Sequence, residues 1–279
     1  MEEFDVEVRG LRLRVCTWGP ADGPVILCLH GLLDQGATWS RVAQPLAAAG
    51  FRVIAPDARG HGRSAHVGAG GYYHFPDYVS DLDGLVTELG LHAPTVVGHS
   101  MGGTVSCWFA AARPSAVRSL VLVEGLGPPP LPDTLAVERM ELFLKGVAKP
   151  PRNKIFPDVA AAAARMTRMQ PGLDPSWATE LAARVLEPVG EGLRWTWDPL
   201  HRTRSPSTFP TQRFLHVLER IASPTTLVYG DRSWYHFEGL AEREAALGHK
   251  VARWVLPASH ALTIDVPERL AEIIVEAAA

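Results

Sequence analysis

The residues with the clearest capacity for chemistry are Gly98-His99-Ser100-Met101-Gly102, which fit the pattern Gly-x-Ser-x-Gly. They follow an apolar run at residues 95–97 and precede a helical pattern, so we expect Ser100 at a sharp turn between a strand and a helix. The backbone of such a turn packs too closely for side chains two positions before and after the serine, and Gly98 and Gly102 meet that need. The alternative is a glycine-rich turn without function, and the context favours a serine nucleophile.

A second pattern, His30-Gly31, directly follows the apolar run at residues 25–29. A turn at this place can aim a backbone N–H at the reacting group, and the residue after the nucleophile supplies another N–H. The sequence therefore predicts an oxyanion hole made by the N–H groups of Leu32 and Met101. The imidazole of His30 is not needed for this role, and it can equally satisfy backbone groups of the turn.

The elements that must position these residues are predicted from hydrophobic patterns. Apolar runs bounded by Gly or Pro are typical of strands buried on both faces of a parallel sheet. They occupy residues 25–29, 53–55, 95–97, 120–123 and 226–229. Helical patterns alternate with them at residues 38–49, 77–89, 102–112, 240–247 and 267–278. Residues 5–18 alternate around Gly10 and predict an antiparallel hairpin. The order indicates the α/β class, with a mostly parallel eight-stranded sheet and helices on both faces.

Residues 127–213 interrupt this alternation. They open with three prolines and contain short amphipathic patterns, such as residues 134–147 and 158–169, but no apolar run typical of a buried strand. We predict a helical cap inserted after the sixth strand. The core domain then consists of residues 1–126 and 214–279.

Residues 25–103 resemble the α/β-hydrolase superfamily in three motifs that stand in the expected order. These are His30-Gly31 after the third strand, Asp57-Ala58-Arg59-Gly60-His61-Gly62-Arg63-Ser64 after the fourth, and the turn at Ser100. The resemblance covers nearly the whole chain except the cap, and it implies a hydrolase that needs neither a metal nor an organic cofactor. It also implies a structural role for the loop at residues 57–64, so His61 is not counted as catalytic.

A serine nucleophile needs a base, and the chain has eleven histidines. In this fold the order is nucleophile, acid and then histidine, with the histidine on a loop after the last strand. Residues 250–256 predict that strand, and the loop at residues 257–261 contains His260. His236 and His249 precede the strand, and His99 points elsewhere if Ser100 projects from its turn. His260 is therefore the predicted base.

The acid departs from the common pattern of the superfamily, which places an Asp three residues after the glycine that ends the seventh strand. Here that position holds Ser233, and a serine cannot stabilise an imidazolium as a carboxylate does. Asp231 is nearby but out of register. The family also uses the end of the sixth strand, where Glu124 follows the apolar residues 121–123. Because geometry takes precedence over residue type, we predict Glu124 as the acid and keep Asp231 as the second candidate.

A Ser-His-Glu set with the acid after the sixth strand is similar to that of offloading thioesterases of certain polyketide pathways. In acid placement it is also similar to some haloalkane dehalogenases. Dehalogenases and epoxide hydrolases need a carboxylate nucleophile to form an alkyl-enzyme ester, so Ser100 argues against both.

The end of the predicted cap, residues 195–204, combines aromatic and basic side chains. Arginine binds carboxylate, sulfate or phosphate through two parallel hydrogen bonds, so Arg202 or Arg204 can hold an anionic substrate group. Together with Trp197 they are candidate substrate-binding residues. The competing interpretation is an ion pair with Asp198 or a solvated charge.

Composition limits the class of partner. The chain is 47% hydrophobic and 20% charged, with a net charge of -3, so it has material for a large core but no basic field for nucleic acid or anionic membranes. Acidic residues at positions 2, 3 and 5, where a secretory signal would be basic, predict a cytoplasmic protein. The cysteines lie apart in apolar stretches, which predicts buried thiols and neither a disulfide framework nor a zinc site. They are Cys16, Cys28 and Cys107.

The sequence thus predicts a serine hydrolase that cleaves a small-molecule ester or acyl thioester through an acyl-enzyme on Ser100. The acyl thioester can be one bound to a carrier protein. Because the turn and the base do not fix the bond that is cleaved, a carbon-carbon bond hydrolase or a lyase is an alternative. A non-catalytic ligand-binding homologue is a further alternative, which only Ser233 favours.

Overall fold

The computed structural model describes residues 1–170, 172–248 and 251–279. One sheet is formed by β1 (Glu2–Val8), β2 (Leu11–Trp18), β3 (Val25–Leu29), β4 (Arg52–Pro56), β5 (Thr95–His99), β6 (Ser119–Val123), β10 (Thr225–Gly230) and β11 (Val251–Leu256). Its strand order is β1-β2-β4-β3-β5-β6-β10-β11. The β1–β2 and β2–β4 pairs are antiparallel and the other pairs are parallel. This confirms the predicted fold class of a mostly parallel eight-stranded sheet.

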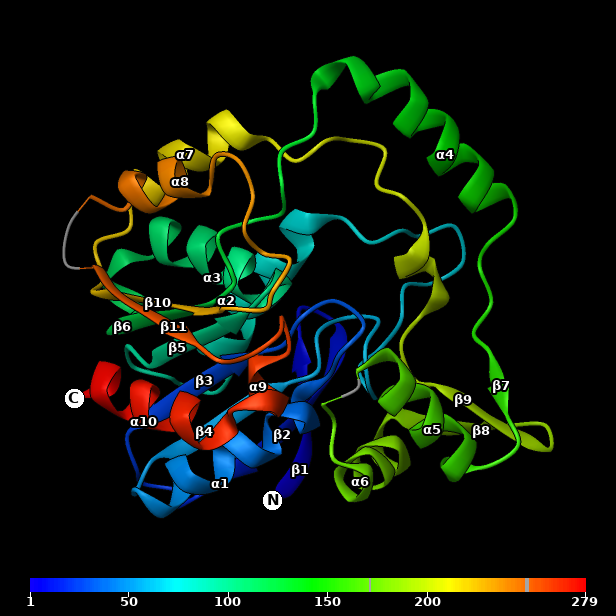
Figure 1. The fold of residues 1–279 in the computed structure, drawn as a ribbon, viewed down its shortest axis with the longest axis horizontal. Coiled ribbons are helices and arrows are strands. Elements are labelled where there is room, and N and C mark those ends of the chain that lie inside the picture. The colour runs from blue at the N-terminus through cyan, green and yellow to red at the C-terminus, as the bar shows by residue number, and fades with distance from the viewer. Residues whose placement is uncertain (171, 249–250) are drawn as a thin grey trace.

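Helices cover both faces of the sheet (Figure 1), which explains why its central strands are apolar on both sides. One face carries α1 (Ser40–Ala48), α9 (Leu262–Asp265) and α10 (Pro267–Ala278). The other carries α2 (Phe75–Glu88), α3 (Met101–Ala112), α7 (Thr211–Glu219) and α8 (Leu240–Ala246). Short 3₁₀ turns are η1 (Gly36–Trp39), η2 (Pro114–Ala116), η3 (Asp133–Leu135) and η4 (Pro199–Arg202). The predicted core helices are confirmed to within a few residues at their ends.

The predicted strands are confirmed as well, with one position outside the described residues. The last strand was expected from Lys250, and its described part begins at Val251. His249, expected just before it, also lies outside the described residues. The three cysteines are buried and unbridged. Within the described ranges, no helix has both the length and the apolar character that crossing a bilayer requires.

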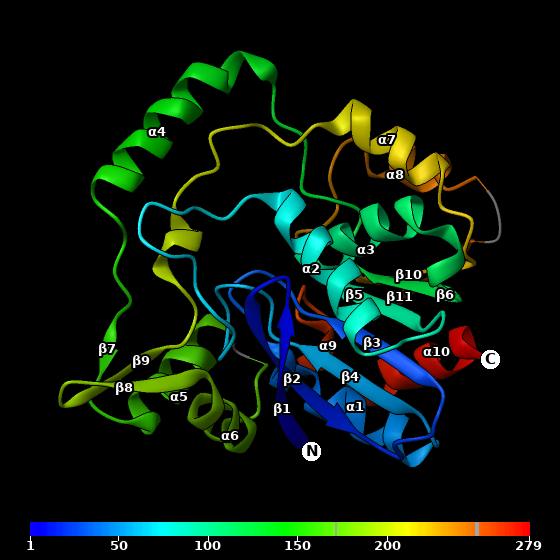
Figure 2. The same ribbon diagram turned by 180° about the vertical axis from the view of Figure 1, so that it is seen from behind.

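Most of the chain between β6 and α7 lies to one side of the sheet (Figures 1 and 2). The helices of this segment are α4 (Ala136–Ala148), α5 (Val159–Met169) and α6 (Pro175–Val185). Asp158 and Asp174 cap the last two by accepting hydrogen bonds from the N–H groups of Ala161 and Trp177. The amphipathic patterns at residues 134–147 and 158–169 are confirmed as helices. We refer to residues 127–213 as the insertion.

The insertion, predicted as a helical cap, contains strands as well as helices. It holds a three-stranded antiparallel sheet in the order β7-β9-β8, made of β7 (Ile155–Phe156), β8 (Leu186–Val189) and β9 (Gly192–Trp195). These strands have two to four residues and only Phe156 and Leu186 are buried in them, so no apolar run marks them. The signal that was missed is the hairpin turn at Gly190, which has a positive φ of 56°.

Arg243 of α8 holds the two junctions between the insertion and the core. Its side chain is 1% exposed and donates from Nη1 to the carbonyls of Leu126 and Pro128, at 2.7 Å each. The guanidinium lies over the ring of Phe209, 5.4 Å from its centroid, at the other junction. Gly127 must lack a side chain here, because a Cβ would come within 3.0 Å of both Phe209 and Arg243. One buried cation therefore ties the chain where it leaves the core and where it returns.

The insertion also packs against the core through His201 of η4. Its ring lies 4.1 Å from that of His61 and 3.9 Å from that of Tyr73, measured between centroids. The Nε2 atoms of both histidines are buried and have no hydrogen-bond partner among the described residues. Burial lowers the pKa of His201 to about 4 and that of His61 well below its usual value, so both rings are neutral at pH 7.

Candidate active site

Ser100 occupies the sharp turn predicted between β5 and α3. Its φ of 53° and ψ of -114° lie in a region that non-glycine residues rarely adopt. The strain is held in place by the neighbouring strand, because the Ser100 N–H donates to the carbonyl of Val123 at 3.0 Å. This backbone conformation is the one expected for a nucleophile that projects from a strand-to-helix turn.

The glycines around Ser100 are required by close backbone contacts. A Cβ on Gly98 would lie 2.5 Å from the Cα of Gly103, and one on Gly102 would lie 2.4 Å from the carbonyl oxygen of Leu29. A Cβ added to Gly103 would lie 2.4 Å from the Cα of Gly125. The need for small residues inferred from the sequence has its cause in these contacts.

Glu124 follows β6 at the same edge of the sheet, and it is also held in an unusual conformation. Its φ is 49°, and its N–H donates to the carbonyl of Val228 in β10 at 3.0 Å. The side chain is completely buried. A buried carboxylate is costly unless donors surround it, and Oε1 accepts the N–H of Gly230 at 2.8 Å. Two adjacent strands are thus followed by residues with positive φ, the predicted nucleophile and the predicted acid.

His260 meets Glu124 directly. The Nδ1 atom lies 2.5 Å from Glu124 Oε2, so the imidazole donates its Nδ1–H to the carboxylate and leaves Nε2 as the acceptor. The loop is fixed by Ser259, which donates both its N–H and its hydroxyl to Asp265, at 2.7 and 2.6 Å. His99 adds a further anchor by donating from Nε2 to the carbonyl of His260 at 2.9 Å. Burial lowers the pKa of His99 to about 3 and keeps it neutral.

Asp231, the second candidate for the acid, lies elsewhere. Its N–H bonds to the carbonyl of Leu256 at 2.9 Å, and its side chain is exposed at the sheet edge. The structure brings Glu124 to the imidazole of His260 and leaves Asp231 toward solvent.

Three residues that the sequence reasoning did not assign to the site surround His260. Ser233 donates its hydroxyl to Glu124 Oε2 at 2.6 Å. The Trp234 ring lies 4.7 Å from that of His260 between centroids, although 59% of Trp234 is exposed. Tyr235 stacks on the imidazole at 6.0 Å and donates to the carbonyl of Gly127 at 2.6 Å. The signal for them was their place three to five positions after Gly230, the glycine that ends β10.

The predicted oxyanion donors lie on two turns near Ser100. Leu32 is in the turn at residues 31–34, in which the Asp34 N–H donates to the Gly31 carbonyl at 3.3 Å. Met101 opens α3, where a helix leaves its N–H groups without intrahelical partners. A Cβ on Gly31 would come within 3.4 Å of the Ser100 Cβ, so the first turn passes close to the nucleophile.

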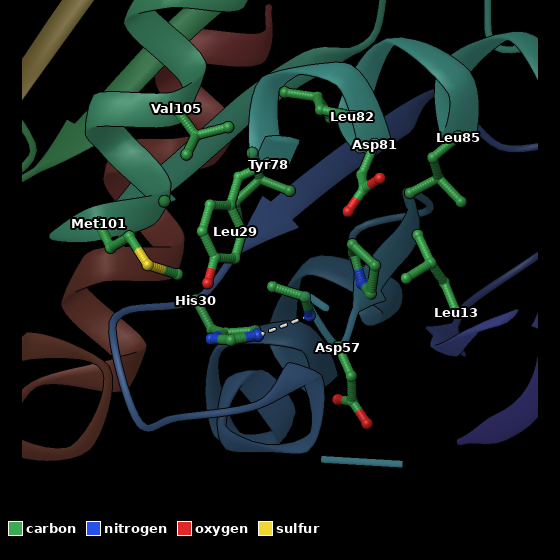
Figure 3. A pocket seen from close by; sticks show the side chains of 13 residues that line it. Leu13, Leu29, His30, Asp57, Tyr78, Asp81, Leu82, Leu85, Met101 and Val105 are labelled. Carbon is green, nitrogen blue, oxygen red and sulfur yellow. Dashed lines mark hydrogen bonds between the residues drawn. The ribbon is translucent and has the colours of Figure 1, made fainter. Parts of the chain in front are cut away.

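The side chain of His30 supports this turn (Figure 3). It donates from Nδ1 to the Gly31 carbonyl at 2.7 Å and accepts the Ala58 N–H on Nε2 at 2.9 Å. Burial lowers its pKa to about 4, which keeps the ring neutral and the two bonds compatible. Behind it lies an apolar cavity of about 40 Å³, which Tyr78 and Met101 help to line. Ligand pockets usually measure about 300–1,000 Å³, so this void alone does not accommodate a substrate.

The candidate binding residues of the insertion are exposed or half-buried. Arg202 and Arg204 are exposed, and no ion pair within the described part of the chain includes either of them. Asp198 is instead used within the structure, because it accepts the Tyr73 hydroxyl at 2.8 Å and the Leu200 N–H at 2.9 Å. Trp197 is half-buried.

Two comparisons place the chain among known sequences. The family model described as alpha/beta hydrolase fold matches residues 24–261. The 3-hydroxybutyrate-oligomer hydrolase of Cupriavidus necator is 30% identical over 272 residues, which are 92% of this chain and 86% of that protein. An epoxide hydrolase of Caballeronia sordidicola is 32% identical over 214 residues, or 74% of this chain and 58% of that protein.

A solved structure matches over the full length. The thioesterase domain from the curacin biosynthetic pathway has a TM-score of 0.91 to this structure at 37% identity, and the match covers 99% of both chains. The chain therefore belongs to the α/β-hydrolase family.

Proposed function

We propose that the protein is a serine hydrolase that cleaves an ester or thioester, with Ser100 as nucleophile, His260 as base and Glu124 as the acid. The observation that carries this proposal is the hydrogen bond of 2.5 Å between His260 Nδ1 and Glu124 Oε2. It fixes the tautomer in which Nε2 is free to take a proton from a serine hydroxyl. The strained turn at Ser100, at the same edge of the sheet, supports the assignment of the nucleophile.

The mechanism follows from these roles. Ser100 Oγ attacks the carbonyl carbon while its proton passes to His260 Nε2, and the N–H groups of Leu32 and Met101 stabilise the oxyanion. The tetrahedral intermediate expels the alcohol or thiol, which takes the proton from Nε2. Water then attacks the acyl-enzyme, gives a proton to Nε2 and releases the carboxylic acid as Ser100 regains its hydrogen. Glu124 stays ionised and balances the imidazolium at both steps.

The class of bond is supported by the nucleophile and by the similar proteins. Epoxide hydrolases are among the relatives, but alkyl-enzyme chemistry needs a carboxylate where this chain has Ser100. The similar thioesterase domain and oligomer hydrolase favour acyl transfer instead. We infer an acyl thioester as the first substrate class to test, including one bound to a carrier protein.

The insertion is the proposed cap that selects the substrate. Arg202 and Arg204 are exposed cations, and the half-buried Trp197 precedes them in the sequence. We infer that one of the arginines binds an anionic group of the substrate through paired hydrogen bonds.

The test uses matched substrates and a covalent probe. The parent protein and Ser100→Ala are treated with a fluorophosphonate, and hydrolysis is measured with p-nitrophenyl butyrate and the butyryl thioester of N-acetylcysteamine. Labelling of the parent at Ser100, together with hydrolysis that the variant lacks, supports the proposal. Absence of both labelling and hydrolysis in the folded parent would overturn it, and a larger kcat/KM for the thioester assigns the class.

A further inference from the structure

We propose that Ser233 is a positioning residue that tunes Glu124, so that the side chain at the family's usual acid position acts through the relocated acid. This inference rests on the proposed function and extends it to a residue outside the Ser-His-Glu set. From the sequence alone, Ser233 was the one feature that favoured a non-catalytic protein. The structure gives it a different meaning.

The geometry joins Ser233 to the same carboxylate oxygen that binds the imidazole. Glu124 Oε2 accepts the Ser233 hydroxyl at 2.6 Å and the His260 Nδ1–H at 2.5 Å. Ser233 Oγ in turn accepts the N–H of Tyr235 at 3.1 Å, which orients the hydroxyl proton toward the carboxylate. The other oxygen, Oε1, is held by the N–H of Gly230. The carboxylate is therefore fixed at both oxygens before any substrate binds.

The chemistry needs such a donor because Glu124 is completely buried. An ionised carboxylate without water requires hydrogen bonds to remain charged, and bonds to a charged group are about twice as strong as neutral ones. Ser233 supplies one of them and shares the negative charge of Oε2. Without it, the whole charge of that oxygen would act on His260. The imidazolium would then be held too strongly for efficient return of its proton.

The structure separates this role from simple packing. Ser233 is half-buried on the loop after β10, and its hydroxyl gives its hydrogen bond to the functional carboxylate and not to a structural carbonyl. Ser223, at the opposite end of β10, offers a matched contrast. Its buried hydroxyl donates to the carbonyl of Val117 at 2.9 Å, away from Glu124. Ser223→Ala is thus the control for Ser233→Ala.

The first experiment is kinetic and uses the full chain with p-nitrophenyl butyrate. We expect Ser233→Ala to lower kcat about tenfold, with KM changed less than about twofold, because the lost hydrogen bond acts on Glu124 and not on the bound substrate. The acid limb of the kcat/KM profile should move to higher pH by about half a unit, since Glu124 then holds the imidazolium more firmly. The titratable neighbours of the imidazole, Glu124, His99 and Tyr235, are unchanged in this variant.

Two further variants distinguish an effect of Ser233 on Glu124 from a purely structural role. Ser233→Thr keeps the hydroxyl and should recover activity to within about threefold of the parent. In a Glu124→Gln background, Ser233→Ala should cost less than about twofold, because residues that act as a unit do not add their losses. An equal loss in both backgrounds, or an unshifted acid limb, would overturn the proposal. Ser223→Ala should match the parent throughout.

A proton NMR measurement without substrate tests the role of Ser233 independently of whether the protein hydrolyses esters. The Nδ1 proton of His260 should give a far-downfield resonance in the proton NMR spectrum of the parent. Ser233→Ala should move it further downfield as Glu124 Oε2 becomes more basic, and Ser223→Ala should not. An unchanged resonance would show that Ser233 does not act on Glu124, whether or not the protein hydrolyses esters. Failure of the fluorophosphonate labelling with a shifted resonance would overturn the proposed function alone.

Discussion

Glu124 Oε2 lies 2.5 Å from His260 Nδ1, although 136 positions separate the two residues in the chain. The contact exists because β6 lies between β5, which ends just before Ser100, and β10, which pairs with β11 before the His260 loop. Parallel strands bring their carboxyl ends to one edge, so three distant segments meet there.

Loss of the nucleophile and loss of the base should cost similar amounts of activity. Ser100→Ala and His260→Ala should each reduce kcat by about three orders of magnitude or more, because members of a triad act as a unit. The double variant should be no worse than either single one. The measurement is ester hydrolysis with circular dichroism as the control for folding, and activity of Ser100→Ala within tenfold of the parent would sink the assignment.

Substitutions of the two candidate acids, Glu124 and Asp231, should lower kcat by very different factors. Glu124→Gln preserves shape but removes the charge that balances the imidazolium, so kcat should fall by roughly three to four orders of magnitude. Asp231→Asn changes an exposed carboxylate and should cost a few-fold at most. The same ester assay checks both variants. The reverse ranking would transfer the role to Asp231.

If the insertion binds an anionic group of the substrate, loss of that contact should raise KM for an anionic substrate. Arg202→Ala or Arg204→Ala should raise KM for a substrate with a sulfate or carboxylate group by about tenfold and leave a neutral analogue unchanged. Initial rates with the two analogues provide the comparison. Equal effects on both analogues would make the arginines structural or merely solvated.

The half-buried ring of His201 should make the protein less stable in acid. Its pKa is about 4 in the fold and near 6.5 in the unfolded chain, so between these values the unfolded state binds a proton that the folded state does not. Stability is unaffected by this group above pH 6.5 and falls as the pH is lowered through that window. His201→Phe keeps the contacts with His61 and Tyr73 but removes the titration.

The urea midpoint of parent and His201→Phe, compared at pH 7.5 and pH 5, measures this effect. The variant should gain about 1–2 kcal/mol relative to the parent on acidification, by the difference in proton uptake. The comparison is needed because Asp57, whose pKa is raised to about 6 by burial, works in the opposite direction in both proteins. A difference independent of pH would mean that His201 is protonated in the fold.

Local patterns carried most of the fold prediction, and distant contacts account for what was missed. Apolar runs and the Gly-x-Ser-x-Gly pattern depend on neighbours in sequence, and they located the strand before Ser100 and the helix after it. Glu124 could be predicted because it directly follows the apolar run of β6, the strand next to β5. The hydrogen bond from Ser233 to Glu124 could not be predicted. The family pattern shows only that position 233 lacks a carboxylate, and not that a hydroxyl there donates to Glu124. The short strands of the insertion escaped because only two of their side chains are buried.

Arg243 has a consequence for how such a chain can diversify. Because the same guanidinium binds the carbonyls of Leu126 and Pro128 and lies over Phe209, the chain leaves and re-enters the core at a single fixed point. We expect the polypeptide between those anchors to tolerate changes in length and sequence that preserve the contacts of His201 with His61 and Tyr73. The insertion is in this sense an exchangeable module, and a segment grafted between Pro128 and Phe209 would inherit the existing attachment.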